Sequence, residues 1–362
     1  SPMPKNPKKL FLLDAYALVY RAHFVFIRNP RRTTTGMNTS AIYGFVNSLV
    51  EVIDKEKPDY LGVAFDVSAP TFRHEMYEEY KAQREETPED IKLAVPIIKR
   101  LLEAMGIPCL EKEGYEADDV IGTIAWKAAE KGVATYMLTP DKDYAQLVKE
   151  NVYMFRPKGK GGGHEVYDAD TIKEKMGVRP DQVADFLGLK GDSVDNIPGV
   201  PKVGEKTAIS LLEEFESMEN LLENIENVSK KSIKKSLEEH REQAELSKTL
   251  AIIKTDVPLD LELDKLKFEP FDKDKVLPIF EELEFKSMAK RLFDEEITIG
   301  GVEEEPMKTF EDVKADYTNA DTPEKRKALI ETLLKQDSFC FDTETTSLDA
   351  HTADLVGLAF SF

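Results

Sequence analysis

Three carboxylates fall within four positions of the stretch GYEADDV (114–120): Glu116, Asp118 and Asp119. If a helix begins here, Glu116 and Asp119 share one face, because residues three apart are neighbours on a helix surface. Acidic side chains this close repel one another unless a cation lies among them. Six further acids stand in other short motifs, and the predicted site is the whole set: Asp14, Asp66, Glu116, Asp118, Asp119, Asp141, Asp143, Asp192 and Asp195.

The donor atoms of this set indicate which cation it could bind. All nine side chains offer hard carboxylate oxygens and no His or Cys joins them, which favours Mg²⁺ or Mn²⁺ over zinc. Two divalent ions carry fewer charges than nine carboxylates, so several acids are expected to bind through metal-held water. Two ions ~3.5–4 Å apart are the arrangement that hydrolyses phosphodiesters, by activating water and stabilising the leaving oxygen.

Each acidic motif also has an ordinary structural interpretation. A single Asp after a strand is usually a turn residue or a helix cap, and the DKD of TPDKD could be solvated surface. The acids of EADD could simply be favoured in the first turn of a helix by its dipole. Their coincidence at several strand ends shifts the balance towards a metal-dependent phosphoryl-transfer site.

Three short apolar runs are the predicted strands that carry these acids: 9–15, 59–66 and 133–141. Asp14, Asp66 and Asp141 stand at or just beyond their carboxyl ends, where open α/β sheets bind ligands. Segments of helical period lie between and beside the runs, at 38–56, 88–105 and 117–131. This alternation predicts an α/β fold, with a mostly parallel sheet and helices on both faces. Thr87 is the predicted N-cap of the second helix and Pro88 its first residue.

The rest of the chain is predicted to be helical and then acidic. A glycine-rich loop or hairpin tip at 156–165 precedes helical patterns that continue to about 293. A helix from 322 leads to a strand, and the sequence ends without room to complete a further domain. The predicted organisation is a disordered start (1–8), an α/β catalytic core (9–175), a helical subdomain (176–293), an acidic linker (294–321) and the beginning of another domain (322–362).

Charge is distributed unevenly along the chain. The net charge is −20, yet residues 1–35 hold seven basic side chains and a single acid, Asp14. Without the nine acids of the predicted site, residues 1–255 are slightly basic, so a polyanionic substrate is reasonable. No run approaches the ~18 apolar residues of a membrane span, and no signal peptide is recognisable. The 2 cysteines are too few for a disulfide framework or a zinc site, which favours a reducing cytoplasm.

Two segments have the composition of phosphate-binding elements. Residues 71–90 combine Arg73, Lys81 and Arg84 with aromatic side chains that could stack on unpaired bases, although an ordinary amphipathic helix has the same pattern. In 197–208, two glycines bracket a tight turn before a helix N-terminus. Such a turn lets backbone N–H groups approach a phosphate closely, and it would read duplex shape rather than base sequence.

Five motifs, in this order, resemble the N-terminal 5′-nuclease domain of bacterial DNA polymerase I, of the 5′-3′ exonuclease and flap endonuclease family: LLDAYALVYR, VAFDVSAPTFRHEMYEEYKAQR, GYEADD, TPDKD and GDSVDNIPGVPKVGEKTA. The resemblance covers about residues 9–293. It implies a PIN-like sheet fold, and it places the family's metal carboxylates on the nine acids, with two or more Mg²⁺ ions or Mn²⁺ in their place. Ala15 departs from the family, which usually has glycine there, and the glycine-rich loop is unlike that of many relatives.

The resemblance also implies how DNA is held. Residues from 71 to about 95 would form a helical arch, with Arg73, Lys81 and Arg84 facing the phosphates of a single-stranded 5′ end. GVPKVG would be a helix-hairpin-helix clamp on duplex DNA, sometimes with a bound K⁺. The implied DNA contacts are Arg21, Tyr77, Tyr80, Gly199, Lys202, Gly204 and Lys206.

Near the end of the chain, FCFDTETTSLD resembles the first motif of the proofreading 3′-5′ exonuclease domain. Its Asp-x-Glu pair would be Asp342 and Glu344. The chemistry of that domain needs further carboxylates downstream, and the sequence stops before them. A pair without proofreading activity is therefore expected here.

The expected activity is a Mg²⁺-dependent, structure-specific 5′-nuclease that removes 5′ flaps and RNA primers, and acts at nicks, during DNA replication and repair. A monomer in the bacterial cytoplasm is expected. Lys81 or Arg84 would add charge in the transition state, and no side-chain nucleophile is needed. Two alternatives stay open: a catalytically inert module that binds DNA junctions, which would lose metal carboxylates, and a small toxin-type ribonuclease, which would lack clamp and arch.

Overall fold

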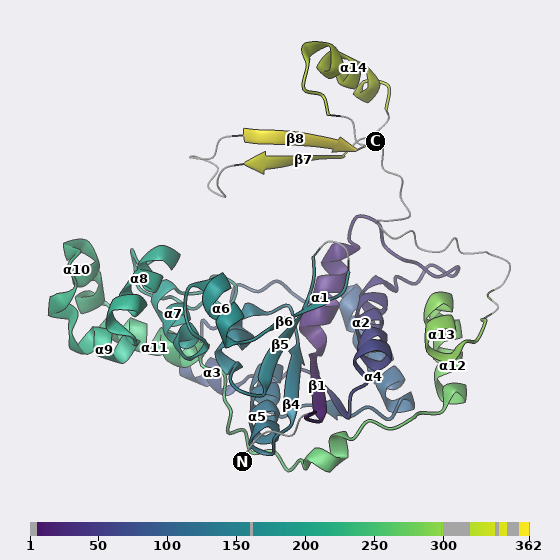
Figure 1. Ribbon diagram of the computed structural model, residues 1–362, viewed down its shortest axis with the longest axis horizontal. Helices are drawn as coiled ribbons and strands as arrows, with labels where there is room; N and C mark the ends of the chain where they lie inside the picture. The colour runs from purple at the N-terminus through teal and green to yellow at the C-terminus, as the bar shows by residue number, and fades with distance from the viewer. Residues whose placement is uncertain are drawn as a thin grey trace. The chain divides into compact units, whose positions relative to one another are not determined.

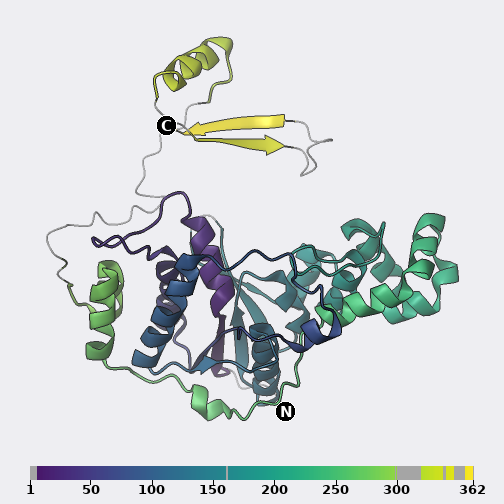
Figure 2. The same ribbon diagram turned by 180° about the vertical axis from the view of Figure 1, so that it is seen from behind.

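The computed structural model describes residues 6–159, 162–297, 299, 319–336, 340–345 and 355–361. The chain divides into two compact units, 1–306 and 307–362, and each is described by itself. Figures 1 and 2 show both units from opposite sides. All nine predicted metal carboxylates belong to the first unit.

A six-stranded sheet forms the centre of the first unit, in the order β3-β2-β1-β4-β5-β6. Its strands are β1 (Lys9–Asp14), β2 (Tyr60–Ala64), β3 (Cys109–Leu110), β4 (Ala134–Leu138), β5 (Val152–Pro157) and β6 (His164–Tyr167). All neighbouring pairs are parallel except β5 and β6, which form an antiparallel hairpin. The three predicted strands are confirmed, and they are neighbours because β1 pairs with both β2 and β4. Pro157 at the start of the glycine-rich stretch pairs with His164 near its end, so the expectation of a hairpin is confirmed at these described residues.

Alternating side chains of β1 belong to two separate cores, as the two-residue period of a strand requires. Leu10 and Leu12 pack in the core that contains α5 (Ala117–Glu130). Phe11 and Leu13 pack in the core that contains α2 (Ser40–Glu51) and α4 (Glu89–Ala104). Figure 1 shows α5 and the α2–α4 pair on opposite sides of the strands. The predicted α/β class, with helices on both faces of a mostly parallel sheet, is confirmed.

The helices after β6 fall into two groups, one on the side of the sheet that α5 covers and one on the side that α2 and α4 cover (Figures 1 and 2). One group is α6 (Ala169–Met176), α7 (Val183–Lys190), α8 (Glu205–Phe215), α9 (Met218–Glu223), α10 (Lys231–Glu239) and α11 (Arg241–Ala251). Within it α7 and α11 cross closely at Gly188, where a Cβ atom would lie 2.8 Å from the Lys248 backbone. The other group, α12 (Lys273–Leu283) and α13 (Lys286–Phe293), packs in the same core as α2 and α4.

Two local predictions differ from the structure. The helix predicted at 88 begins one residue later, with Pro88 as its N-cap, and the Thr87 hydroxyl accepts a hydrogen bond from Tyr20. In the predicted arch only α3 (Phe72–Met76) is helical before α4 begins. Residues 78–83 form turns instead, and Lys81 has the left-handed backbone angle φ 57°.

In the second unit, the described residues form one helix and one hairpin. These are α14 (Pro323–Leu333), β7 (Cys340–Thr345) and β8 (Leu355–Ser361), with β7 and β8 antiparallel. Asp342 and Glu344 stand on β7, opposite Ala359 and Gly357, and their side chains lie outside the description. Most of the predicted linker 294–321, and the first five residues of the predicted disordered start, also lie outside the described ranges. Within those ranges no helix combines the length and the apolar character that a membrane span needs.

Candidate metal centre

Three of the predicted acids stand where the three central strands end. Asp14 is the last residue of β1, Asp66 comes two residues after β2, and Asp141 comes three residues after β4. The parallel pairing brings these ends to one edge of the sheet. Strand order also reverses there, because β2 and β4 lie on opposite sides of β1, and such a switch point is where open sheets bind ligands.

The first turn of α5 supplies the next three acids. Glu116 is the N-cap of this helix, and it forms a capping box with Asp119, whose Oδ2 accepts the Glu116 N–H at 3.0 Å. Asp66 Oδ1 accepts the Ala117 N–H at 2.8 Å, so the acid after β2 also contacts this helix start. One oxygen each of Glu116, Asp118 and Asp119 lies within 4.8 Å of the others.

The last three acids form a second group, in which one oxygen each of Asp143, Asp192 and Asp195 lies within 4.8 Å of the others. Asp192 and Asp195 stand on a closed loop, in which Asp192 and Ile197 exchange both backbone hydrogen bonds. The loop closes tightly at Gly199: a Cβ atom there would lie 2.4 Å from the Gly191 nitrogen, and its φ of 64° also favours glycine. A glycine-closed loop therefore presents two acids towards the short helix that carries Asp143.

Repulsion and burial at this edge raise the pKa values of several acids. Burial, followed by repulsion from Asp66 and Asp141, raises the pKa of Asp14 to about 7. Two hydroxyls hold its Oδ2, those of Tyr144 at 2.8 Å and Thr139 at 3.3 Å. Both follow β4 within TPDKDY, and the sequence prediction missed them because hydroxyls in such a motif carry no distinctive spacing.

The same causes act in both groups of acids. Burial and the neighbouring Asp119 and Glu116 raise the pKa of Asp118 well above its ordinary value. Burial, Asp141 and Asp192 do so for Asp143. Each of these acids is thus influenced by others of the set, as expected when all converge on one crevice.

Lys81 and Arg84 supply positive charge to this edge. The Lys81 ammonium contacts Glu116, and Arg84 donates to Asp195 at 2.5 Å. Burial would raise the pKa of Glu116, but Lys81 and Arg73 outweigh it and lower that pKa to about 2. The backbone helps to hold this arrangement, because the Lys81 N–H donates to the Asp195 carbonyl oxygen at 2.9 Å.

The residues present fit divalent cations. Both groups offer carboxylate oxygens alone, which suits Mg²⁺ or Mn²⁺. Asp118 Oδ1 is buried and has no hydrogen-bond partner, a costly state for an acceptor that a cation would relieve. This orphaned oxygen is an observation of the fold itself that indicates a cation.

Comparison with known proteins identifies the family. A family model described as "5'-3' exonuclease, N-terminal resolvase-like domain" matches residues 9–177, and one described as "5'-3' exonuclease, C-terminal SAM fold" matches 178–274. A 5'-3' exonuclease of Aquifex aeolicus is 41% identical over 285 residues, which cover 79% of this chain and 95% of that protein. The chain belongs to the 5′-3′ exonuclease family.

Other relatives are longer proteins. DNA polymerase I of Bacillus subtilis is 41% identical over 314 residues, which cover 85% of this chain but only 35% of that polymerase. DNA polymerase I of Bacillus caldotenax is 36% identical over 97% of this chain and 38% of its own length. The exonuclease chain thus spans well under half the length of these curated polymerases.

Solved structures share the fold at low sequence identity. A T5 5′-exonuclease with bound divalent metal ions (zinc) superposes with a TM-score of 0.60 at 20% identity, over 76% of this chain and 99% of that one. The catalytic core of Rad2 in complex with DNA substrate gives 0.54 at 16% identity, over 80% and 92%. The predicted PIN-like sheet with a helical C-terminal part is confirmed, and the chain is a nuclease by family.

Arg73 and Tyr80 do not lie as the arch prediction required, because both side chains are buried. Arg73 is 2% exposed, and its guanidinium is bonded to Glu116, Asp119 and two backbone carbonyls, so it cannot face a phosphate. Tyr80 is 4% exposed and donates its hydroxyl to Glu116, so its ring is not open for base stacking. Tyr77 is half-buried and packs against the α5-side core.

The predicted clamp turn of the exonuclease is partly internal. The Gly199 N–H donates to Ser247 Oγ at 2.9 Å, which removes it from the groups that could bind a phosphate. Gly204 is exposed at the start of α8, and a Cβ there would meet nothing within 4 Å. Lys202 and Lys206 are exposed beside it. Of the predicted DNA contacts, Lys202, Gly204 and Lys206 are therefore the ones exposed to solvent at the clamp turn.

Two further features bear on nucleic-acid contact in the exonuclease. Arg21 is half-buried and donates to the Lys158 carbonyl oxygen at 2.8 Å, so part of its guanidinium is already used. Four lysines that were not predicted stand at the N-cap and on the first turns of α10, whose Ser236 Oγ donates to the Pro201 carbonyl and joins the helix to the clamp turn. The signal was the run SKKSIKKS, whose lysines are Lys230, Lys231, Lys234 and Lys235.

Proposed function

We propose that this chain is a Mg²⁺-dependent, structure-specific 5′-nuclease that cleaves DNA at 5′ flaps and nicks and removes RNA primers. The observation that carries the proposal is the convergence of carboxylates at the ends of β1, β2 and β4, with the orphaned oxygen of Asp118 among them. Family membership supplies the class of reaction, hydrolysis of a phosphodiester.

The two groups of acids would hold the ions: Glu116 and Asp118 in the first, and Asp143, Asp192 and Asp195 in the second. Asp14, Asp66 and Asp141 line the sheet edge between them. When bound, two such ions supply an activated water and stabilise the leaving oxygen, and Mn²⁺ could replace Mg²⁺. The chain's own part is to orient these oxygens, and Tyr144 and Thr139 do so for Asp14.

Lys81 and Arg84 are the proposed cations for the reacting phosphate. The side chain of Arg84 is 51% exposed, and that of Lys81 is 18% exposed, so both border the carboxylates and solvent. A positive charge aimed at a developing oxyanion is a common way to stabilise phosphoryl transfer. Of the three basic residues that the sequence proposed for this role, these two fit it and Arg73 does not.

The helical part is the proposed grip on duplex DNA. The first turn of α8 offers unpaired backbone N–H groups at a helix N-terminus, with Lys202 and Lys206 beside it, and the α10 lysines extend this basic surface. A K⁺ ion at the helix-hairpin-helix turn is part of the proposal. Structural neighbours that were solved with DNA support a nucleic-acid substrate.

The wider setting is also proposed from the relatives. The similarity to DNA polymerase I over 97% of the chain supports a role beside a polymerase in replication and repair. A monomer in the bacterial cytoplasm is also part of the proposal. Residues 9–175 would be the catalytic core, 176–293 the DNA-binding helices and 294–321 a linker. Residues 322–362 would begin a 3′-5′ exonuclease domain, with Asp342 and Glu344 as its Asp-x-Glu pair.

Cleavage of a 5′-labelled flap duplex tests this function. We expect products with Mg²⁺, none with EDTA, and none from Asp118→Ala, whereas Asp170→Ala, an exposed acid on α6, should cleave normally. Tight binding without Mg²⁺-dependent cleavage would favour an inert junction-binding module. Cleavage of unpaired RNA alone would favour a toxin-type ribonuclease.

A further inference from the structure

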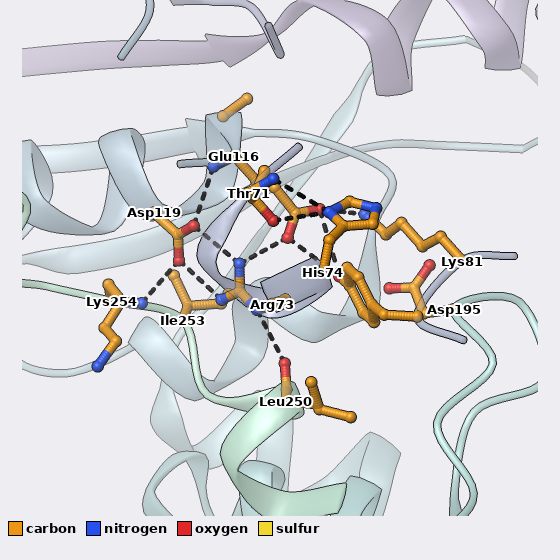
Figure 3. A network of polar contacts seen from close by, with 12 residues as sticks. Thr71, Arg73, His74, Lys81, Glu116, Asp119, Asp195, Leu250, Ile253 and Lys254 are labelled. Atoms are coloured by element: carbon orange, nitrogen blue, oxygen red, sulfur yellow. Dashed lines mark hydrogen bonds and ion pairs between the residues drawn. The ribbon is translucent and has the colours of Figure 1, made fainter. Parts of the chain in front are cut away.

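Arg73 is a fully buried arginine whose five N–H donors are all used. Figure 3 shows its guanidinium among Glu116, Asp119 and Leu250. Nε donates to the Leu250 carbonyl at 2.9 Å. Nη1 donates to Glu116 Oε2 at 2.5 Å and Asp119 Oδ2 at 2.8 Å. Nη2 donates to Asp119 Oδ1 at 2.8 Å and the Ile252 carbonyl at 2.7 Å. Only a guanidinium has five donors in a rigid plane, so no other side chain could make this set.

Asp119, the main partner of Arg73, is saturated in the same way. Each of its oxygens accepts one hydrogen bond from the guanidinium. Oδ2 also accepts the Glu116 N–H at 3.0 Å, and Oδ1 accepts the Lys254 N–H at 2.8 Å. Four bonds fill the four lone-pair positions of a carboxylate, and the side chain is 0% exposed. Asp119 therefore differs from Asp118, which keeps a buried oxygen without a partner.

The pair joins the ends of two helices that are far apart in sequence. Asp119 lies in the first turn of α5, where negative charge is favoured by the helix dipole. Leu250 and Ile252 lie at the C-terminus of α11, whose last carbonyls need donors and are favoured by a cation. Arg73 thus caps α11 and, through Asp119, fixes the start of α5.

We propose that Arg73 and Asp119 are positioning residues of the metal centre: they hold Glu116 in place for the ion and lock the end of α11 to it, and neither touches metal or DNA. The inference rests on the proposed metal-dependent nuclease, and it assigns roles to two residues that sequence reasoning had placed among the phosphate contacts and the ligands.

The geometry gives a physical reason for such a pair. Glu116 Oε2 is fixed by Arg73 and by the Tyr80 hydroxyl at 3.0 Å, so the carboxylate can turn little. Outer partners that orient a metal ligand typically account for 10–100-fold in metal affinity or activity. The same contacts connect α11, which also supports the clamp turn through Ser247, to the carboxylates.

Binding of Mn²⁺ by the full chain, measured by calorimetry without DNA, tests the proposal. The variants are Arg73→Lys, which keeps the charge and at most three of five donors, Asp119→Asn, and the double variant. Lys248→Met is the matched control: Lys248, also on α11, forms a largely buried ion pair with Asp185 of α7 and a second pair with Glu219, and neither acid belongs to the two carboxylate groups. Unfolding temperatures and affinity for a flap duplex in EDTA are measured for each.

We expect Arg73→Lys and Asp119→Asn each to weaken Mn²⁺ binding by about 10–100-fold and to change DNA affinity by less than about threefold. The double variant should lose no more than the worse single variant, because the two residues act as one unit. Lys248→Met should lower the unfolding temperature and leave Mn²⁺ affinity within about twofold.

Four results would overturn the inference. Unchanged Mn²⁺ affinity in Arg73→Lys with impaired DNA binding would return Arg73 to the phosphate contacts. Additive losses in the double variant would make Asp119 an independent ligand, and equal losses in Lys248→Met would show general destabilisation. If the unaltered chain binds no Mn²⁺, or Asp118→Ala binds it normally, the metal centre itself fails, which separates that failure from one confined to Arg73 and Asp119.

A second measurement needs no substitution, and so holds if the variants do not fold. Crystals of the unaltered chain are soaked in Mn²⁺ and the ions are located by anomalous diffraction. We expect Mn²⁺ on Glu116 and Asp118, with both oxygens of Asp119 still on Arg73. An ion coordinated by Asp119 would overturn the proposal.

Discussion

The metal-free chain should become less stable as the pH rises from 5 to 8, and Asp14 should be a main cause. Its carboxyl is buried between Asp66 and Asp141, and its pKa is raised from 3.8 to about 7. The folded state therefore binds this proton more tightly than the unfolded chain does. Stability from such a group is fully present below the unfolded pKa and is lost as the pH rises through the folded pKa.

The size of the effect follows from the shift. One pKa unit corresponds to about 1.4 kcal/mol, so the interval between pH 5 and a pKa of about 7 gives about 3 kcal/mol from Asp14 alone. The raised pKa values of Asp118 and Asp143 act in the same direction. Glu116 does not oppose them in this window, because its lowered pKa of about 2 keeps it ionised in both states above pH 5. A loss of this size is a large fraction of a typical 5–15 kcal/mol stability.

Urea unfolding in EDTA, followed by circular dichroism at pH 5, 6, 7 and 8, measures the slope. Asp14→Asn should reduce the loss of stability between pH 5 and pH 8 by about 3 kcal/mol. Asp14 is the N-cap of α1 (Ala15–Val25), and an amide can keep that role but does not titrate. Asp168→Asn is the control, since this exposed N-cap has a lowered pKa and stays ionised throughout the window. Mg²⁺ at pH 8 should restore stability by binding the ionised carboxylates of the folded state.

A free energy of unfolding that is constant or rises from pH 5 to pH 8 in EDTA would refute this account of the crevice. So would an Asp14→Asn variant with the slope of the unaltered chain, because another group would then be responsible. If Mg²⁺ stabilised the chain equally at pH 5 and pH 8, its binding would not depend on these protons.

Three further substitutions separate chemistry, DNA binding and folding. Lys81→Ala should lower the single-turnover rate of flap cleavage by about 10²–10³-fold while DNA still binds, and an unchanged rate would exclude Lys81 from the reaction. Lys231→Ala on α10 should weaken duplex binding similarly for all sequences and reduce the slope of log affinity against log salt by about 1, measured by fluorescence anisotropy. Gly199→Ala should destabilise the chain by about 3 kcal/mol in urea unfolding, because its Cβ would lie 2.4 Å from a backbone nitrogen, whereas Gly204→Ala, with open space around its Cβ, should not.

The sheet edge and its acids could be predicted from sequence because the signals are local. Asp14, Asp66 and Asp141 each follow an apolar run, and parallel strands place their carboxyl ends together whatever the rest of the fold does. The second group was less direct, since Asp192 and Asp195 come from a loop more than 50 residues further along than Asp141. Their closeness to Asp143 depends on how α7 and the glycine-closed loop pack, which no short pattern encodes.

The partners of Arg73 could not be predicted, because they come from two distant segments, the start of α5 and the end of α11. The carbonyls of Leu250 and Ile252 lie 177 and 179 positions away from it in sequence, and any residue type could provide them. Within 71–90, no sequence pattern separates a buried Arg73 from an exposed Arg84, so both were assigned to phosphates. Burial distinguishes them: one guanidinium is enclosed between two helix ends, and the other is half exposed.

The segment that contains Arg73, Lys81 and Arg84 therefore holds cations of two kinds. Arg73 cannot exchange its partners, because all five donors are used in a site closed to water. Lys81 and Arg84 can exchange their partners, because both border solvent. Their partners Glu116 and Asp195 are carboxylates that would also attract metal ions. Ions bound there would displace these two side chains from the carboxylates, and the side chains could then bind an incoming phosphate. Arg73 would still hold Glu116 in place. A single stretch of basic residues could then balance the acids without metal and serve the substrate with it.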